Sequence, residues 1–308
     1  MTEKKYNKSS GRIFLAWAHS KTEPNFGDEL SPYILSKITG MNIVHIPVLN
    51  NRIHLLILIA KRLLTFKINE GWDFVRLFCG KKFYIFLGSI IQFYKLNGGI
   101  VWGAGLIDDN YTTGKHIYYA VRGPKTKALL EKNGNRVPEV FGDPALFLPK
   151  IYDKPVAIKS KVGVIPHIIH YDDLLSRQIN CQMTVIDLRT QDIERVIDDI
   201  RSCELVISSS LHGLIVAHSY GIPALWVELG SSKLMGNNVK FFDYFESIQL
   251  SAYNQISIDL YDLDNLKTIE ILFENYWNNA LPIKGNLDNV FDKFLLGAPP
   301  KIKKFIQF

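Results

Sequence analysis

Cysteine is scarce in this chain of 308 residues, which carries three: Cys79, Cys181 and Cys203. Three widely spaced thiols exclude a disulfide-stapled secreted domain and a cysteine-based zinc ribbon, and they are typical of a reducing cytosol. The first residues also lack the apolar core of a signal peptide. We therefore expect a cytoplasmic protein.

A strong excess of one charge is also missing. Lys and Arg number 36 against 30 Asp and Glu, a formal net charge of +6. This mild excess favours anionic partners in general. Because no zinc-finger spacing, arginine-rich run or helix-turn-helix pattern is present, we expect no nucleic-acid partner. A hydrophobic share of 47% excludes a disordered chain.

No apolar run is long enough to cross a bilayer. The segment from Ile53 to Phe66 reads IHLLILIAKRLLTF, and Lys61 and Arg62 interrupt it before the roughly 18 apolar residues that a span needs. Two interpretations stay open. The segment is either a helix packed on the core or, with the basic residues that follow it up to Lys82, a surface in peripheral contact with anionic lipid.

Short apolar runs alternate with helical patterns along most of the chain, which is typical of an α/β fold with parallel sheets. The length of the chain and a cluster of Lys and Pro near residues 149–160 predict two α/β domains. We place these domains at residues 1–152 and 153–286, followed by a C-terminal helix and basic tail at residues 287–308. The expected strands are residues 13–17, 83–87, 100–102, 117–121, 162–166, 183–186, 205–207 and 223–227.

Ligands of such sheets bind beyond the carboxyl ends of the strands, and four of these junctions carry polar groups. At the first, the strand expected at residues 205–207 leads into three serines, residues 208–210, and then delivers His212 to the first turn of a helix. Free N–H groups and the helix dipole favour an anion there, and His212 could donate to a phosphate or transfer a proton. Ordinary serine capping beside a packed histidine explains the same residues.

At the second junction, Arg122 leaves a strand beside a helix that begins at Pro124, with Lys125 next in the sequence. A planar guanidinium in this position suits bidentate capture of a carboxylate or phosphate. The alternative is an arginine on the surface.

The third junction places His167 and His170 three residues apart, ahead of Asp172 and Asp173. No further ligand with zinc-site spacing follows, so a metal site is not favoured. His167 is the better candidate for a proton donor or anion contact, and His170 is expected to be structural.

At the fourth junction, Asn25 and Asp28 precede a helix that is expected to end at Gly40, with Pro32 tolerated near its first turn. Asp28 either caps this helix or hydrogen-bonds a sugar hydroxyl and accepts its proton. The common phosphate loops and the nucleophilic-serine elbow are absent from the sequence.

Together these segments resemble the polysaccharide pyruvyl transferases. The resemblance covers roughly residues 11–230, in the family's order: NFGDELSPYI from Asn25, VWGAG from Val101, AVRGPKT from Ala120, GDPALFLP from Gly142, VGVIPHIIHY from Val162 and SSSLHGLIVAHSYGIPALWVE from Ser208. It implies two Rossmann-like domains facing across a cleft, as in the B-type glycosyltransferases.

The resemblance also implies a reaction. Phosphoenolpyruvate would be the donor, a pyruvate ketal on two sugar hydroxyls the product, and no metal or other cofactor is expected. The acceptor would be a saccharide or lipid-linked oligosaccharide of a capsule, lipopolysaccharide or exopolysaccharide. Among the matched positions, the donor-binding set is Arg122, Leu211 (through its backbone), His212, Ser209, His167 and Lys125. Asn25 and Asp28 would face the acceptor, and His212 and Asp28 would be catalytic.

One departure from the family pattern concerns charge. Many members carry arginine directly before the Leu-His pair, whereas this chain has Ser210. Lys125, Lys233 or Lys240 would have to supply the missing cation. Two alternatives stay open: a glycosyltransferase of the same fold that uses a nucleotide sugar, and a non-catalytic carbohydrate-binding subunit.

Overall fold

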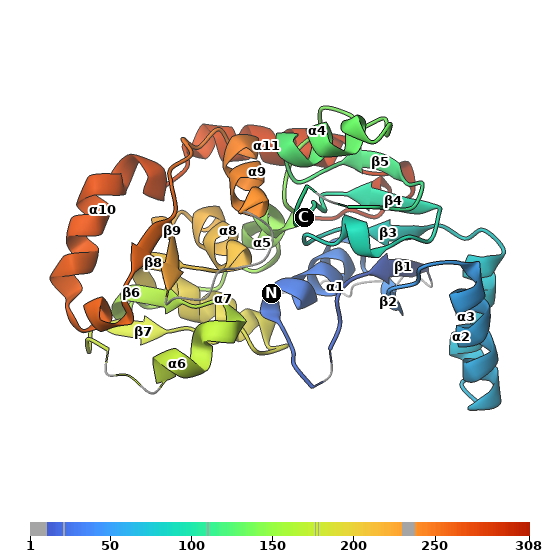
Figure 1. Ribbon diagram of the computed structural model, residues 1–308, viewed down its shortest axis with the longest axis horizontal. Helices are drawn as coiled ribbons and strands as arrows, with labels where there is room; N and C mark the ends of the chain where they lie inside the picture. The colour runs from blue at the N-terminus through green and yellow to red at the C-terminus, as the bar shows by residue number, and fades with distance from the viewer. Residues whose placement is uncertain (1–10, 21, 110, 176, 178, 230–237) are drawn as a thin grey trace, which may run out of the picture.

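The computed structural model describes residues 11–20, 22–109, 111–175, 177, 179–229 and 238–308. Within these residues the chain forms a mixed α/β structure with two five-stranded sheets, and every strand pair in both sheets is parallel (Figure 1). The α/β class expected from the sequence is therefore confirmed, and each sheet is Rossmann-like in character.

The first sheet has the strand order β2-β1-β3-β4-β5. Four of its strands lie where apolar runs predicted them, because strands buried in a parallel sheet are apolar on both faces. The fifth, β2, was not expected: it is a partly exposed edge strand whose apolar residues are interrupted by His45. The bounds are β1 (Arg12–Ala16), β2 (Asn42–Ile46), β3 (Phe83–Ile85), β4 (Gly99–Trp102) and β5 (Ile117–Ala120).

The second sheet has the strand order β10-β9-β8-β6-β7. Strands β6, β7, β8 and β9 agree with the prediction, whereas the edge strand β10 was not predicted. Cys203 does not continue the apolar face of the preceding helix, because that helix ends at Arg201 and Cys203 begins β8. The bounds are β6 (Ser160–Ile165), β7 (Met183–Val185), β8 (Cys203–Ser208), β9 (Ala224–Leu229) and β10 (Ile256–Ile258).

Helices follow most strands. Gly40 ends the first one in the left-handed conformation, as expected, with φ of 64°. Pro32 lies well inside this helix rather than near its first turn. The bounds are α1 (Phe26–Thr39), α2 (Arg52–Leu64), α3 (Ile68–Phe78), α4 (Pro124–Lys132), α5 (Leu148–Ile151), α6 (Tyr171–Leu175), α7 (Ile193–Arg201), α8 (Leu211–Ser219), α9 (Val239–Ser247), α10 (Leu266–Ala280), α11 (Lys284–Leu296) and α12 (Pro300–Lys303).

The C-terminal segment returns to the first half of the molecule. The Trp102 ring on β4 stacks on Phe294 of α11 with ring centroids 5.0 Å apart, and its indole N–H donates to the Phe294 carbonyl. Near the end of the chain, the Gln307 N–H donates to the carbonyl of Ile38 in α1. The chain thus passes from the first sheet to the second within residues 121–159. Helices α11 and α12, which come later, return to pack on the first sheet. The boundaries at residues 152 and 286 stay predictions.

Cys79 and Cys181 are exposed free thiols, and Cys203 is a buried one. In the described part of the chain, the helices are too short or too polar to span a bilayer.

Candidate functional site

The start of helix α8 presents unsatisfied groups. Ser210 is the N-cap residue, yet its side chain makes no capping hydrogen bond, so the serine-capping interpretation is wrong. Leu211 is the first helical residue, and the leading N–H groups of a helix have no partner within it. The Nε2 atom of His212 is buried and has no hydrogen-bond partner among the described residues. This helix start is therefore equipped to bind an anion.

The start of helix α1 is arranged differently. Asn25 is the N-cap residue, and its Oδ1 accepts a hydrogen bond of 2.9 Å from the Gly27 N–H. The interpretation that Asp28 caps the helix is therefore wrong. The cap uses only Oδ1 of Asn25, so its amide NH2 group can contact an acceptor molecule. The Asp28 carboxyl does not cap the helix and is available for proton transfer.

These two helix starts meet at the boundary between the halves. A Cβ atom on Gly27 would lie 2.3 Å from Nδ1 of His212, so only glycine leaves room for the imidazole. Beside this contact, the Phe26 N–H donates to the carbonyl of Leu188 at 2.8 Å. Asp28 and His212, the two predicted catalytic residues, are thereby brought to one place from opposite halves of the chain.

Lys240 in the first turn of α9 links the groups of this site electrostatically. Burial raises the pKa of the Asp28 carboxyl to about 7, an effect that Glu29 strengthens and Lys240 opposes. Burial lowers the pKa of His212 to about 3, and the positive charges of Arg122 and Lys240 act in the same direction. The pKa of Lys240 itself falls to about 8, mainly through burial. At neutral pH the site thus holds a cation, a neutral imidazole and a carboxyl poised to exchange a proton.

A second imidazole borders Lys240. Burial lowers the pKa of His167 to about 4, and Lys240 and His170 add to this shift. The Nδ1 atom of His167 is buried without a partner among the described residues, while its backbone N–H donates to Ser209 Oγ at 2.7 Å. This hydrogen bond fixes the loop that carries His167. It is the contact that the structure shows for the Ser209 hydroxyl.

Arg122 is buried, contrary to the alternative of a surface arginine. Its Nε donates to Asp243 of α9 at 3.0 Å, and its remaining nitrogens donate to Ser89 and to the Leu106 carbonyl. Asp243 also accepts hydrogen bonds from the backbone N–H and hydroxyl of Thr126. The guanidinium is fully covered, so the contacts shown are structural, and its charge reaches the site through the low-dielectric interior.

Of the lysines considered for the cation missing at Ser210, Lys240 opposes the raised pKa of Asp28 and helps to lower the pKa values of His167 and His212. Lys125, predicted to bind the donor, instead pairs with Glu246 at 2.9 Å, and both side chains are partly exposed. Lys233 lies outside the described residues.

An aromatic and histidine cluster next to Asp28 was not anticipated from the sequence. The rings of Trp17 and His45 lie 4.2 Å apart, and His19 lies 5.3 Å from His45. Nδ1 of His19 contacts Glu29 Oε1 at 2.7 Å. The signal that could have found it was positional, because Trp17 and His45 lie at the carboxyl ends of the neighbouring parallel strands β1 and β2.

A metal site at the third junction gains no support. Asp172 pairs with Arg189 at 2.7 Å. Over the part of the chain that the structure describes, no three His, Cys, Asp or Glu side chains are grouped as a metal ion would require. The expectation of a metal-free reaction stays a prediction.

The sequence is similar to those of known proteins. The uncharacterized protein L143 of Acanthamoeba polyphaga mimivirus is 31% identical over 201 residues, which are 60% of this chain and 70% of that protein. The model of the polysaccharide pyruvyl transferase family matches residues 25–231, a span that begins at the cap of α1 and includes His167 and His212. The chain belongs to the polysaccharide pyruvyl transferase family.

Proposed function

We propose that this protein transfers the pyruvyl group of phosphoenolpyruvate to two hydroxyls of a sugar in a cell-surface or exopolysaccharide glycan. The product is a pyruvate ketal, and phosphate is released. Family membership supports a transferase that acts in polysaccharide synthesis. The observation that carries the finer proposal is geometric: His212 abuts Gly27, the residue before Asp28, and both His212 Nε2 and His167 Nδ1 are buried without a partner among the described residues.

The donor is a small molecule with a carboxylate and a phosphate close together, so it needs several N–H and cationic partners. Lys240, Nε2 of His212, Nδ1 of His167 and the leading N–H groups of α8 supply them. Both imidazoles are neutral before the donor binds, because their pKa values lie at about 3 and about 4. Since an adjacent anion raises the pKa of an imidazole, donor binding draws protons toward these nitrogens.

Asp28 is suited to the proton transfers at the reacting carbons. With a pKa of about 7, it can donate a proton to the methylene carbon and then accept the proton of the first sugar hydroxyl as that hydroxyl attacks C2. The second hydroxyl displaces the phosphate, and its proton leaves on the phosphate, with His212 placed to carry it. One hydroxyl proton thus ends on the new methyl group and the other on the phosphate.

The acceptor sugar binds on the α1 side of the site. Asp28 and the Asn25 amide face it, and the cluster of Trp17, His19 and His45 offers the aromatic surface and polar edges that sugars bind. Either a free saccharide or a lipid-linked oligosaccharide presents the required pair of hydroxyls.

The test is to incubate the protein with phosphoenolpyruvate and candidate saccharides, and to measure both phosphate release and acceptor mass. We expect phosphate and an acceptor heavier by one pyruvate ketal. His212→Ala should abolish both signals, whereas His54→Ala, which changes an exposed histidine on α2, should not.

Two results would contradict the proposal. A mass increase of one hexose from a nucleotide sugar would identify a glycosyltransferase. Saccharide binding in calorimetry without turnover of either donor would identify a carbohydrate-binding subunit.

A further inference from the structure

Helices α2 and α3 form a hairpin that projects from the first half of the molecule (Figure 1). Its base is anchored, because Leu55, Phe74 and Leu77 belong to the core beneath the first sheet. The two helices approach closely at Gly71, where a Cβ atom would lie 2.7 Å from Cδ2 of Leu63. The hairpin is thus a built element with one face of α2 turned to α3 and the other turned to solvent.

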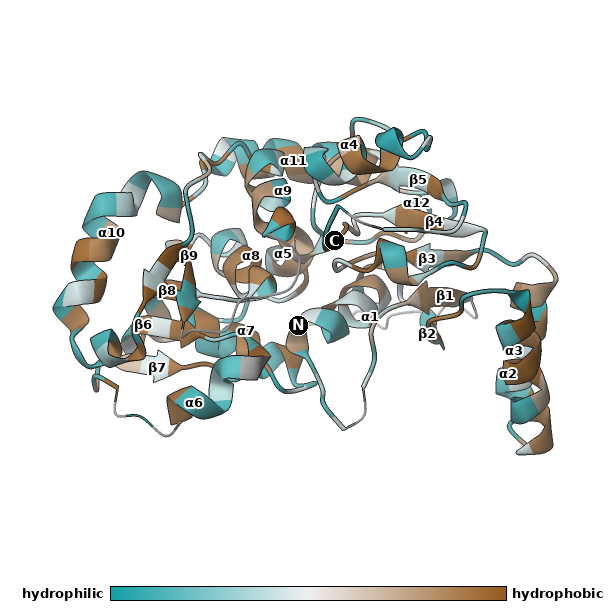
Figure 2. Cartoon of the chain, in the orientation of Figure 1, coloured by the Kyte–Doolittle hydropathy of each residue, from teal (hydrophilic) through white to brown (hydrophobic). Residues whose placement is uncertain are grey.

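The solvent-facing side of the hairpin carries many large apolar side chains among its polar ones. Along α2 the exposed positions recur with helical spacing, and the turn adds Phe66, which is 88% exposed, next to Leu64 at 80%. Figure 2 shows this hydrophobic colouring extending along the hairpin away from the body. The exposed apolar set is Ile53, Leu56, Ile57, Leu63, Leu64, Phe66, Ile68 and Trp72. A contiguous surface of this kind marks an interaction site.

The charge of the hairpin region indicates which kind of partner this surface binds. Residues 52–82 contain seven Lys and Arg and two acidic residues, a local excess of five in a chain whose formal charge is +6. Both acids are paired within the hairpin region, Glu70 with Arg62 at 3.2 Å and Asp73 with Arg76 at 2.8 Å. A second copy of the hairpin would bring like charges together, whereas an anionic surface complements them.

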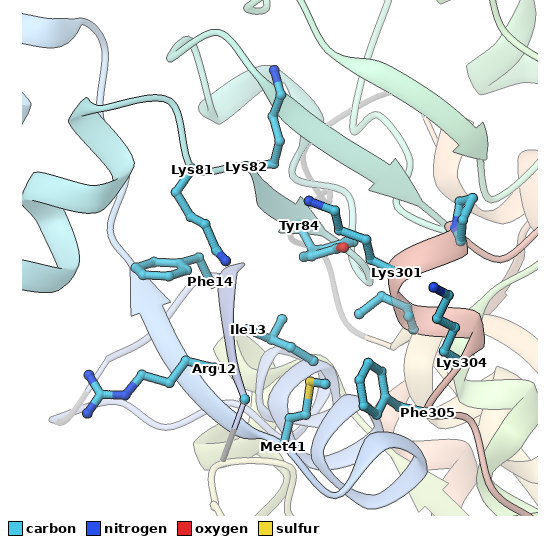
Figure 3. Close-up of a pocket in the computed structure, with 13 residues that line it drawn as sticks. Arg12, Ile13, Phe14, Met41, Lys81, Lys82, Tyr84, Lys301, Lys304 and Phe305 are labelled. Atoms are coloured by element: carbon cyan, nitrogen blue, oxygen red, sulfur yellow. The ribbon is translucent and has the colours of Figure 1, made fainter. Parts of the chain in front are cut away.

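A basic pocket adjoins the base of the hairpin (Figure 3). Lys81 and Lys82 lie between α3 and β3, and together with Lys301 and Lys304 near the C-terminal end they line a cavity of about 430 Å³. In the described part of the chain, none of these four lysines has a carboxylate partner within salt-bridge distance. Apolar and aromatic side chains complete the lining: Ile13, Phe14, Met41, Tyr84, Ile302 and Phe305.

We propose that the α2–α3 hairpin binds the surface of an anionic phospholipid bilayer. Leu64, Phe66 and Ile68 at the turn enter the interfacial layer, while Lys61 and Lys67 lie at the level of the headgroups. The pocket at the base of the hairpin receives a lipid phosphate, with its apolar lining against the glycerol and first acyl carbons. This pocket lies at the amino ends of β1 and β3, the opposite sheet edge from Asp28, so the inference does not depend on the proposed reaction.

The test is flotation of the purified full chain with vesicles of phosphatidylcholine, with and without phosphatidylglycerol. We expect flotation with the anionic vesicles, and a decrease when salt is raised. The double variant Leu64→Ser/Phe66→Ser should bind these vesicles about tenfold more weakly. The matched control Trp277→Ser/Ile283→Ser removes two apolar side chains that are 52% and 71% exposed on the second half, and it should bind like the unmodified protein.

The pocket is tested separately with Lys81→Glu/Lys82→Glu, which should weaken flotation, while free glycerol phosphate should not compete with the vesicles. Equal flotation with neutral and anionic vesicles would overturn the proposal, as would undiminished flotation of the hairpin variant. Light scattering that shows a dimer dissociated by Leu64→Ser/Phe66→Ser would assign the surface to a second copy instead. Competition by glycerol phosphate would assign the pocket to a soluble ligand.

Discussion

Two contacts between the halves of the molecule differ in how far their polar groups are satisfied. Between α4 and α9, Arg122 and Thr126 surround Asp243, and the carboxylate accepts three hydrogen bonds. Between α1 and α8, Gly27 abuts His212, whose Nε2 has no hydrogen-bond partner in the described chain.

This difference distinguishes a contact that stabilises the fold from a contact that is available for a reaction. Buried polar groups are normally paired, because an unpaired group costs free energy. The clamp around Asp243 follows this rule and fixes the halves. The contact at His212 departs from this rule, because its buried Nε2 has no partner among the described residues. We propose that this unpaired nitrogen binds a ligand. The comparison predicts that variants of the clamp change stability, whereas variants of the second contact change activity.

Arg122→Ala should break the clamp and produce the largest effect. It leaves Asp243 buried with its charge uncompensated, which costs about 3–5 kcal/mol of unfolding free energy. Urea denaturation measures this loss. Lys125→Ala, which removes the neighbouring but partly exposed pair with Glu246, should cost about 1 kcal/mol or less. Equal losses in the two variants would show that the buried pair does not hold the halves.

Gly27→Ala should disturb the second contact without weakening the fold. The new methyl group would lie 2.3 Å from Nδ1 of His212, so the imidazole must move, and a displacement of about 1 Å costs on the order of a hundredfold in turnover. Phosphate release from phosphoenolpyruvate measures this. Gly285→Ala is the matched control, because Gly285 is also the second residue of a helix and a Cβ atom added there would meet no described atom within 4 Å. Full activity of Gly27→Ala would remove His212 from the reaction.

The pH dependence of the unfolding free energy tests the role of Asp28, and the expected effect is intermediate in size. Its pKa is raised in the folded protein from 3.8 to about 7, so folding favours the protonated form. The associated stability is fully present below pH 4 and is lost as pH rises through 7. Asp28→Asn, which cannot ionise, should match the unmodified protein at pH 4 and exceed its unfolding free energy at pH 8 by about 2 kcal/mol, allowing for partial exposure of the carboxyl. Parallel curves from pH 4 to 8 would contradict the raised pKa.

Much of this arrangement could be predicted from the sequence, since strands buried in parallel sheets are continuous apolar runs and ligand groups follow their carboxyl ends. That logic led to Asp28, His167 and His212 as candidate site residues, and their roles stay predictions. The edge strands β2 and β10 were missed because partly exposed strands carry a weaker pattern.

Contacts between residues far apart in the sequence could not be predicted, for a different reason. Asp243 lies 121 residues from Arg122, and no periodicity or motif records which acid a buried arginine meets. The sequence therefore predicted a guanidinium that binds substrate, whereas the structure shows one that binds Asp243. Lys240 was among three candidate cations, and only the folded structure shows that its charge affects the pKa values of Asp28 and His212.

The smallest expected effect on stability concerns the difference in capping between the start of α1 and the start of α8. Asn25 and Ser210 are both residues that cap helices well, but Asn25 bonds the Gly27 N–H and Ser210 makes no capping bond with its side chain. Asn25→Ala should therefore lower the unfolding free energy by about 1 kcal/mol, and Ser210→Ala should lower it by no more than a few tenths. Thermal or urea denaturation at fixed pH resolves this difference. Equal losses would mean that α8 is capped like α1, and its leading N–H groups would then not be free for the phosphate of the donor.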